Sequence, residues 1–180
     1  SNTTFDKAQS PKYDYDNLGY NIYSLLLEER LNTNWKTMLK EELFDPLGLK
    51  NTTAFVPLND KNVAKTYMPG ENGVELIYLQ KDDNTMHSAG GLYSTTEDLG
   101  NWMLYNMKTK KGPIDEKIFS YATSALLKVD SVKKSLEPFQ INGYGLGWKT
   151  GTYKNNSVVY HSGSFAGSLS LISFMPDQEI

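Results

Sequence analysis

Apolar residues recur at helical spacing near the start of the chain. Between residues 18 and 31 they follow an i, i+4 pattern, which predicts one helix with a buried apolar face. The positions that carry the pattern are Ile22, Tyr23, Leu26, Leu27 and Leu31. The preceding segment, residues 1–11, is polar and has no period, so we expect a loop there.

Three further helices are indicated by capping and helix-stopping residues. Asn34 is a suitable N-cap for a second helix, which Asp45-Pro46-Leu47-Gly48 ends. The segment Ser94-Thr95-Thr96-Glu97 has the form of a capping box and begins a third helix, which ends at Gly112-Pro113. A fourth helix is expected at residues 115–127.

The remaining segments predict loops and then strands. Residues 51–87 are rich in Asn, Asp, Gly and Lys and are expected to be mostly irregular, with one strand or hairpin arm at Val74–Leu79. Residues 129–142 also indicate a loop. Short β-prone runs follow at Ser157–Tyr160 and Leu169–Phe174, separated by turns rich in Gly and Ser. Helices first and strands last predict an α+β fold.

The strand region begins late and stops at Ile180 within a strand-like run. We interpret residues 1–180 as a single partial domain, mainly helical and looped up to about residue 140 and composed of strands from about residue 141 onward. So small a sheet leaves an edge strand without a neighbour. The rest of the sheet is therefore expected outside this chain, or in a second copy of the chain that pairs with the exposed edge to form a dimer.

Composition and charge exclude several classes of function. The 180 residues are 39% hydrophobic and 22% charged, with a net charge of -3, which leaves no surplus of Lys and Arg for binding nucleic acid. The lack of cysteine excludes disulfides and thiolate zinc sites, and two histidines are too few for a histidine-rich metal site. No apolar run reaches the roughly 20 residues of a transmembrane helix, and no signal peptide opens the chain. We expect no metal and no cofactor.

Two segments carry side chains that suit chemistry, and each also has a purely structural interpretation. Tyr15-Asp16-Asn17 precedes the first helix, where a tyrosine usually packs and an asparagine usually caps the helix. His161-Ser162-Gly163-Ser164 follows a β-prone run, where a lone histidine is usually structural or solvated. Gly163 and Gly167 favour a functional interpretation, because small residues allow a ligand to approach the backbone closely.

Five short motifs occur in a recognisable order and are spread over most of the chain, from Tyr15 to Gly163. They are Tyr15-Asp16-Asn17, Phe44-Asp45-Pro46-Leu47-Gly48-Leu49, Ser88-Ala89-Gly90-Gly91-Leu92, Tyr144-Gly145-Leu146-Gly147-Trp148 and His161-Ser162-Gly163. Taken jointly, they resemble the serine β-lactamase and penicillin-binding protein superfamily, in particular its class C-like esterase, D-aminopeptidase and DD-peptidase branch. The resemblance implies an incomplete β-lactamase/transpeptidase-like fold.

The resemblance also implies acyl transfer through a covalent acyl-enzyme. In the family a Ser-x-x-Lys serine attacks a carbonyl group, while its lysine and the Tyr-x-Asn tyrosine manage the proton. Tyr15 would then be the proton shuttle, and Asn17 would hold the substrate amide by hydrogen bonding.

By the same resemblance, His161 stands where many relatives carry the lysine of Lys-Thr-Gly. Because a histidine is cationic only when protonated, a substrate carboxylate would be held less firmly near pH 7. This favours an esterase or peptidase over an efficient β-lactamase. Ser162, Gly163 and Ser164 would bind substrate along the strand, and the backbone N–H of Ser164 would donate one oxyanion-hole hydrogen bond.

Two literal motif matches lie outside the expected positions. Lys149-Thr150-Gly151 spells the third motif but runs into a segment that indicates a turn, so His161 is preferred. Ser131-Val132-Lys133-Lys134 spells Ser-x-x-Lys but comes late in the chain among charged residues, so we interpret it as a surface loop. The nucleophilic serine is therefore expected upstream of Ser1, and this chain alone is expected to be inactive.

The sequence thus predicts a fragment of a serine hydrolase whose parent cleaves an amide or ester of a small molecule or peptide. The resemblance places that parent in a bacterial periplasm or at the cell surface. Two alternatives remain open at this point. One is a non-catalytic module that binds a peptide, a cell-wall fragment or a partner in the same groove. The other is a structural domain, in which Tyr15 and His161 would lie far apart.

Overall fold

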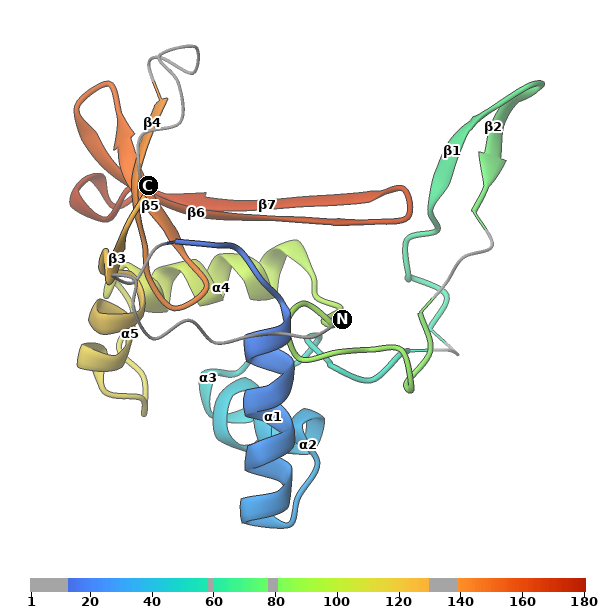
Figure 1. The fold of residues 1–180 in the computed structure, drawn as a ribbon, viewed down its shortest axis with the longest axis horizontal. Helices are drawn as coiled ribbons and strands as arrows, with labels where there is room; N and C mark the ends of the chain where they lie inside the picture. The colour runs from blue at the N-terminus through green and yellow to red at the C-terminus, as the bar shows by residue number, and fades with distance from the viewer. Residues whose placement is uncertain (1–12, 58–59, 78–80, 130–138) are drawn as a thin grey trace.

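The computed structural model describes residues 13–57, 60–77, 81–129 and 139–180. Within these ranges the chain forms a helical part, a two-stranded ribbon and an antiparallel sheet (Figure 1). The helical elements are α1 (Leu18–Leu31), α2 (Trp35–Leu39), the π-helix η1 (Lys40–Phe44), α3 (Asp45–Leu47), α4 (Thr96–Asn106), α5 (Glu116–Ala122) and the 3-10 helix η3 (Pro176–Gln178). The strands are β1 (Tyr67–Gly70), β2 (Gly73–Leu76), β3 (Leu127–Lys128), β4 (Phe139–Tyr144), β5 (Lys149–Tyr153), β6 (Asn156–Phe165) and β7 (Ser168–Phe174). The predicted α+β class is confirmed.

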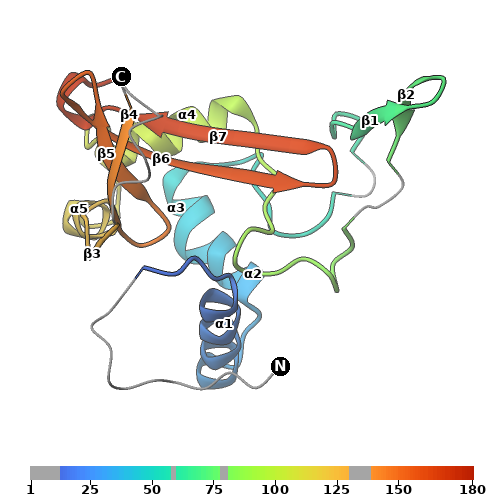
Figure 2. The same cartoon turned by 45° about the horizontal axis from the view of Figure 1, so that its top comes forward.

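The sheet contains β3 to β7 in sequence order, and each strand pairs with the next in antiparallel direction. Two-residue turns at Lys154-Asn155 and Ala166-Gly167 join the last three strands, and all four turn residues have positive φ, as in type I′ hairpins. β5 pairs with β6 only as far as Tyr160, whereas β7 pairs with it as far as Phe165. Among the described strands, the second half of β6 therefore has a neighbour on one edge only. Figures 1 and 2 show the β6–β7 hairpin extending past the other strands of its sheet.

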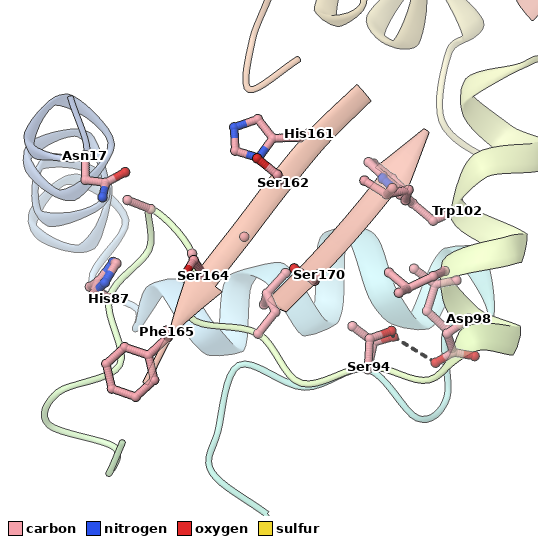
Figure 3. Close-up of a pocket in the computed structure, with 18 of the residues that line it drawn as sticks. Asn17, His87, Ser94, Asp98, Trp102, His161, Ser162, Ser164, Phe165 and Ser170 are labelled. Atoms are coloured by element: carbon pink, nitrogen blue, oxygen red, sulfur yellow. Dashed lines mark hydrogen bonds between the residues drawn. The ribbon is translucent and has the colours of Figure 1, made fainter. Parts of the chain in front are cut away.

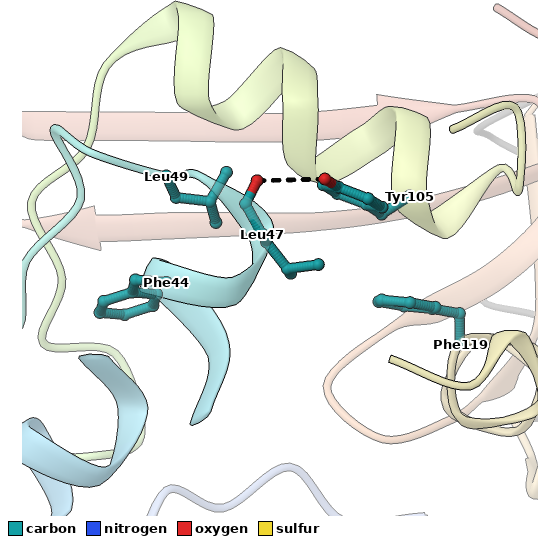
Figure 4. Close-up of a cluster of buried hydrophobic side chains, with 5 residues drawn as sticks. All are labelled: Phe44, Leu47, Leu49, Tyr105 and Phe119. Carbon is teal, nitrogen blue, oxygen red and sulfur yellow. Dashed lines mark hydrogen bonds between the residues drawn. The ribbon is translucent and has the colours of Figure 1, made fainter. Parts of the chain in front are cut away.

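One cluster of buried side chains joins the helical elements to one another. It consists of Phe44, Leu47, Leu49, Tyr105 and Phe119 (Figure 4). The hydroxyl group of Tyr105 donates a hydrogen bond of 3.1 Å to the carbonyl oxygen of Leu47, which satisfies a polar group inside this core. Each fully buried side chain of this size contributes about 1.5–3 kcal/mol to folding.

A second cluster fixes α4 against one face of the sheet. Trp148, Val159 and Phe174 are buried there, and Trp102 and Met103 of α4 pack against them. Because side chains of a strand alternate between its two faces, the face of β6 that carries Val159 also carries His161, two residues further along. This packing therefore determines the side of the sheet on which the predicted third motif lies.

The predicted second helix continues to Leu47, but it changes on the way from α2 through the π-helix η1 to α3. Its N-cap is Asn34, as predicted, and the side-chain oxygen of Asn34 accepts a hydrogen bond from the backbone N–H of Lys36. Pro46 does not stop the helix, because it lies in the first turn of α3, where a missing N–H costs little. Gly48 then ends the helix in the left-handed conformation, with φ of 70°.

The predicted third helix begins one residue later than the capping box suggested. Thr95, rather than Ser94, is the N-cap of α4, and its hydroxyl accepts a hydrogen bond from the N–H of Asp98. Asp98 is 3% exposed, and its carboxylate accepts hydrogen bonds from the backbone N–H of Asn51 and the hydroxyl group of Thr52. The start of α4 is therefore tied to the loop that follows α3.

Other local predictions are also wrong in their boundaries. The third helix ends at Asn106 rather than at Gly112-Pro113. The fourth helix stops at Ala122 rather than at residue 127, because Leu127–Lys128 pair with β4 instead. β4 begins at Phe139, inside a segment predicted as loop. The irregular region contains a complete ribbon, β1 with β2, rather than one arm at Val74–Leu79. Strand pairing is a tertiary contact that local composition does not encode.

α1 has the predicted ends but not the predicted burial. Its apolar positions are largely exposed, with Ile22 at 45%, Tyr23 at 62% and Leu26 at 62%, whereas Ser24 is buried. The i, i+4 pattern therefore identifies the span of the helix but not a buried apolar face. In the described part of the chain, α1 is instead held through its polar side.

Candidate active site

Tyr15 and His161 lie close together, although 145 residues separate them in the sequence. Tyr15 belongs to the segment ahead of α1 and His161 to β6, and their ring centroids are 6.1 Å apart. Tyr144, the last residue of β4, lies beside both, with its ring centroid 6.3 Å from that of Tyr15 and its hydroxyl oxygen 3.4 Å from Nε2 of His161. This proximity counts against the structural interpretation, which required the two side chains to lie far apart.

Asn17 precedes α1 but does not cap it with its side chain. The carboxylate of Asp16 takes that role, since its Oδ1 accepts a hydrogen bond of 2.6 Å from the N–H of Leu18. The amide of Asn17 is thereby left to line the cleft (Figure 3). The ordinary explanation of an asparagine before a helix, an N-cap, does not hold here.

A cleft of about 600 Å³ lies between the β6–β7 hairpin, α4 and the segment around residues 87–94. All six residues singled out from the sequence line it: Tyr15, Asn17, His161, Ser162, Gly163 and Ser164. Apolar side chains also line it, among them Trp102, Leu99 and Ile172. The structure thus brings the predicted site residues together around one concave surface, which is the usual form of a ligand site.

The sequence suggested that His161-Ser162-Gly163-Ser164 follows the end of a strand. In the structure the motif lies inside β6. The two-residue hairpin turns fix the hydrogen-bonding alternation, so even-numbered residues of β6 face β5 and odd-numbered residues face β7. β5 begins at Lys149, which pairs with Tyr160, so its pairing with β6 does not reach beyond Tyr160. The backbone groups of Ser162 and Ser164 therefore point to an edge with no described strand. In the described part of the chain, this edge of β6 is available to an extended ligand.

Burial and charge both lower the pKa of His161. Loss of solvation is the larger cause, the positive charge of Lys149 adds to it, and a backbone hydrogen bond involving Ser162 acts in the opposite direction. With an ordinary histidine pKa near 6.5, the imidazole is therefore mainly neutral at pH 7. His161 consequently offers hydrogen bonds rather than a fixed positive charge.

Burial raises the pKa of Tyr144 well above its ordinary value, and the neighbouring phenols of Tyr20, Tyr15 and Tyr13 raise it further. The hydroxyl group of Tyr144 is therefore protonated across the working pH range and can donate to a neutral imidazole. The sequence placed Tyr144 in a motif but gave it no part in the site. The position of Tyr144 at the start of that motif was the sequence feature that could have identified it as a site residue.

His87 and Lys81 also line the cleft, and neither was singled out from the sequence. Burial lowers the pKa of His87, and the positive charge of Lys81 lowers it further. Nδ1 of His87 is buried and has no hydrogen-bond partner among the described residues. Lys81 holds its ammonium group 4.7 Å from the ring centroid of Phe165, at the tip of the β6–β7 hairpin. The signal for His87 was its place directly before the Ser88–Leu92 motif.

Hydrogen bonds join α1 to the wall of the cleft. The hydroxyl group of Ser88 lies 2.8 Å from that of Ser24 and 3.2 Å from Oδ1 of Asn21. The same Asn21 oxygen accepts a hydrogen bond from the N–H of Ala89. Since Tyr15 and Asn17 directly precede α1, these contacts set their position relative to the 88–91 segment.

The two literal motif matches have different outcomes. Lys149-Thr150-Gly151 does not run into a turn, because β5 continues to Tyr153 and the turn begins at Lys154. Ser131-Val132-Lys133-Lys134 lies outside the described residues.

Within the described ranges no group of three acidic or histidine side chains is arranged to hold a metal ion. No helix there is long and apolar enough to cross a membrane.

Comparison with known proteins gives consistent results. A family profile described as Beta-lactamase matches residues 2–180. The unguisins hydrolase ungD' of Aspergillus campestris (strain IBT 28561) is 26% identical over 173 residues, covering 91% of this chain and 31% of that protein. Beta-lactamase-like protein 4 of Dictyostelium discoideum is 26% identical over 175 residues, covering 89% of this chain and 30% of that protein. The chain thus spans under a third of the length of these relatives.

Solved structures with the same fold include penicillin-binding protein homologues and β-lactamases. The octameric penicillin-binding protein homologue from Pyrococcus abyssi superposes with a TM-score of 0.77 at 22% identity, over 94% of this chain and 37% of that one. A class C β-lactamase gives a TM-score of 0.68 at 16% identity, over 96% of this chain and 53% of that one. The described residues therefore form part of a β-lactamase/transpeptidase-like fold, as the motifs predicted.

Proposed function

This chain belongs to the beta-lactamase family, and on that premise we propose that its cleft is part of the active site of a hydrolase that forms an acyl-enzyme on a serine. The substrates are amides or esters of small molecules or peptides. The chain is proposed to be a single partial domain of a longer protein, because it covers 31% and 30% of the two curated relatives and 37% and 53% of the two solved structures.

The observation that carries the proposal is the position of Tyr15 and His161 beside the free edge of β6. A carbonyl group placed on that edge can accept a hydrogen bond from the N–H of Ser164, which points outward there. Hydrogen bonds of this kind stabilise the oxyanion that forms during acyl transfer. The amide of Asn17 lines the same cleft and is available to hold a substrate amide.

In the proposed reaction, a serine hydroxyl attacks the substrate carbonyl, and the bond to the amine or alcohol breaks. Tyr15 passes the serine proton to the departing group, with the family lysine as its partner, and water then hydrolyses the acyl-serine ester. Among the described hydrogen bonds, no serine that lines the cleft is bonded to a lysine. We propose that the serine and lysine belong to another part of the parent protein, so this chain alone is inactive.

The neutral state of His161 shapes the proposed activity. A permanently charged lysine at this position would hold a substrate carboxylate, whereas a neutral imidazole offers one hydrogen bond. The third motif by itself therefore favours esterase or peptidase activity over efficient β-lactamase activity. By family resemblance alone, the proposal places the parent protein in a bacterial periplasm or at the cell surface.

Labelling of the full-length parent protein with a fluorophosphonate probe tests the proposal. We expect one serine to be modified, within a Ser-x-x-Lys motif upstream of Tyr15, and the variant Tyr15→Phe to be labelled much more slowly. Tyr121→Phe is the matched control, because Tyr121 is 60% exposed and does not line the cleft. A folded parent that shows no labelling would exclude the acyl-enzyme and favour a non-catalytic module that binds a peptide or a cell-wall fragment.

A further inference from the structure

The tip of the β6–β7 hairpin touches two other parts of the chain. The ammonium group of Lys81 lies 4.7 Å from the ring centroid of Phe165, the last residue of β6. In the turn that follows, a Cβ on Gly167 would collide with Cδ1 of Ile77 and with the carbonyl oxygen of Tyr67. Figures 1 and 2 show the tip beside the base of the β1–β2 ribbon. The free edge of β6 therefore ends against protein rather than in solvent.

Lys81 is held in place by the segment that follows it. Its ammonium group donates a hydrogen bond of 3.4 Å to the carbonyl oxygen of Thr85, and the carboxylate of Asp82 accepts one from the N–H of Thr85. The next residue, Asp83, forms an ion pair of 2.8 Å with Lys36 of α2, which is only 4% exposed. The segment that carries Lys81 is thereby tied to the helical part of the fold.

The proposed reaction gives the substrate a direction along β6. Tyr15 passes a proton to the departing amine or alcohol, so the leaving group lies beside Tyr15. The ring of Tyr15 is 6.1 Å from that of His161, near the beginning of the free edge. Ser164, whose N–H would hold the carbonyl oxygen, lies further along the strand. The acyl group of the substrate therefore runs from Ser164 toward Phe165 and the tip of the hairpin.

We propose that Phe165 and Lys81 limit the length of the acyl group that the cleft accepts. Both side chains line the cleft, and Figure 3 shows Phe165 at the end of β6 directly beyond Ser164. One residue of extended strand, about 3.3 Å, separates the carbonyl position from this contact. The substrates are then esters or amides of short acyl groups, such as butanoyl or a single amino acid, and not of long fatty acids. This inference rests on the proposed function and adds the size of the acyl group.

The test compares p-nitrophenyl butanoate with p-nitrophenyl octanoate on the full-length parent protein. For the wild type we expect kcat/KM to be roughly tenfold lower for the octanoate, because its longer chain meets the tip of the hairpin. Phe165→Ala should raise the octanoate-to-butanoate ratio of kcat/KM roughly tenfold. Tyr121→Ala, which removes an exposed ring outside the cleft, is the matched control and should keep the wild-type ratio. A wild type that hydrolyses both esters equally, or an unchanged ratio in Phe165→Ala, would overturn the length limit.

Two variants of Lys81 test the other half of the contact. Lys81→Ala shortens the side chain that faces Phe165 and should also raise the octanoate-to-butanoate ratio. Lys81→Met keeps the length of the side chain without its charge and should keep most of the limit, because the limit is steric. Lys154→Ala, which removes a lysine in the β5–β6 turn, is the control. A wild-type ratio in Lys81→Ala, or an equal rise in Lys81→Ala and Lys81→Met, would contradict this role of Lys81.

Equilibrium binding separates this inference from the proposed function, because it needs no nucleophile. Isothermal titration calorimetry would compare N-butanoylglycinamide with N-octanoylglycinamide on the wild-type parent protein and on Phe165→Ala. Weaker binding of the octanoyl amide to the wild type, relieved in Phe165→Ala, supports the length limit even if fluorophosphonate labelling fails. A parent protein that is labelled but binds the octanoyl amide as tightly as the butanoyl amide contradicts the limit and leaves the acyl-enzyme proposal intact.

Discussion

The hydroxyl oxygen of Tyr144 lies 3.4 Å from Nε2 of His161 and joins two motifs that are 17 residues apart in the sequence. Burial shifts the pKa of each group in the direction that keeps it uncharged, upward for Tyr144 and downward for His161. The contact is therefore one between neutral groups, and it depends on protonation. An imidazolium ring has N–H groups at both nitrogens and cannot accept a hydrogen bond from a phenol.

Removing the phenol should change the titration of His161. In Tyr144→Phe we expect the pKa of His161 to rise, because the lost hydrogen bond stabilises the neutral imidazole. Titration of the imidazole carbon resonances by NMR measures this pKa, and His87 in the same spectrum serves as an internal control that should not move. A downward shift of the His161 pKa would instead show that the ring donates to Tyr144.

The two histidines should make folding stability depend on pH. The pKa values of His87 and His161 are both lowered in the folded state, while an unfolded chain has histidines near pH 6.5. Below that pH the unfolded state binds more protons, so the free energy of unfolding should fall as the pH drops from 7.5 to 5.5. Urea denaturation at several pH values measures the slope. A double variant, His87→Gln with His161→Gln, should flatten it, and an unchanged slope would contradict the assignment.

The two candidate third motifs should respond differently to an added methyl group. A Cβ on Gly151 would collide with the backbone carbonyl of Gln140 in β4, which can move only if the strands separate. A Cβ on Gly163 would meet the hydroxyl of Ser170, a side chain that can rotate away. We expect Gly151→Ala to cost about 2 kcal/mol of stability or more, and Gly163→Ala less than about 1 kcal/mol. Thermal unfolding of both variants checks the order, and equal losses would contradict it.

The sequence predicted the elements that local rules control. Asn34 caps its helix and the span Leu18–Leu31 is right, because capping and apolar periodicity are local signals. The ordered motifs identified the fold and selected residues that share one cleft. The pairing of Leu127–Lys128 with β4 and the location of Lys149 at an open strand edge were missed. Both depend on strand register, which is set by contacts between distant segments.

The hydrogen bond inside the helical core should make a measurable contribution to stability. Tyr105→Phe keeps the aromatic packing against Phe119 but leaves the carbonyl oxygen of Leu47 without its donor. Loss of a partner for a buried acceptor should cost about 1–2 kcal/mol. Urea denaturation measures the loss, with Tyr121→Phe as an exposed control that should unfold like the wild type. If the two variants are equally stable, the Leu47 carbonyl has another donor.

Asp16 and Asn17 should separate stability from function, although they are adjacent. The carboxylate of Asp16 accepts a hydrogen bond from the N–H of Leu18. Asp16→Ala removes this cap of α1 and should therefore cost about 1 kcal/mol of stability. Asn17 makes no side-chain cap hydrogen bond and lines the cleft, so Asn17→Ala should change stability by less than about 0.5 kcal/mol. In the full-length parent, Asn17→Ala should nevertheless slow acylation by an amide probe far more than Asp16→Ala does. Unfolding curves and acylation rates of both variants provide the comparison. A large stability loss in Asn17→Ala with unchanged acylation would show that the residue serves the helix and not the substrate.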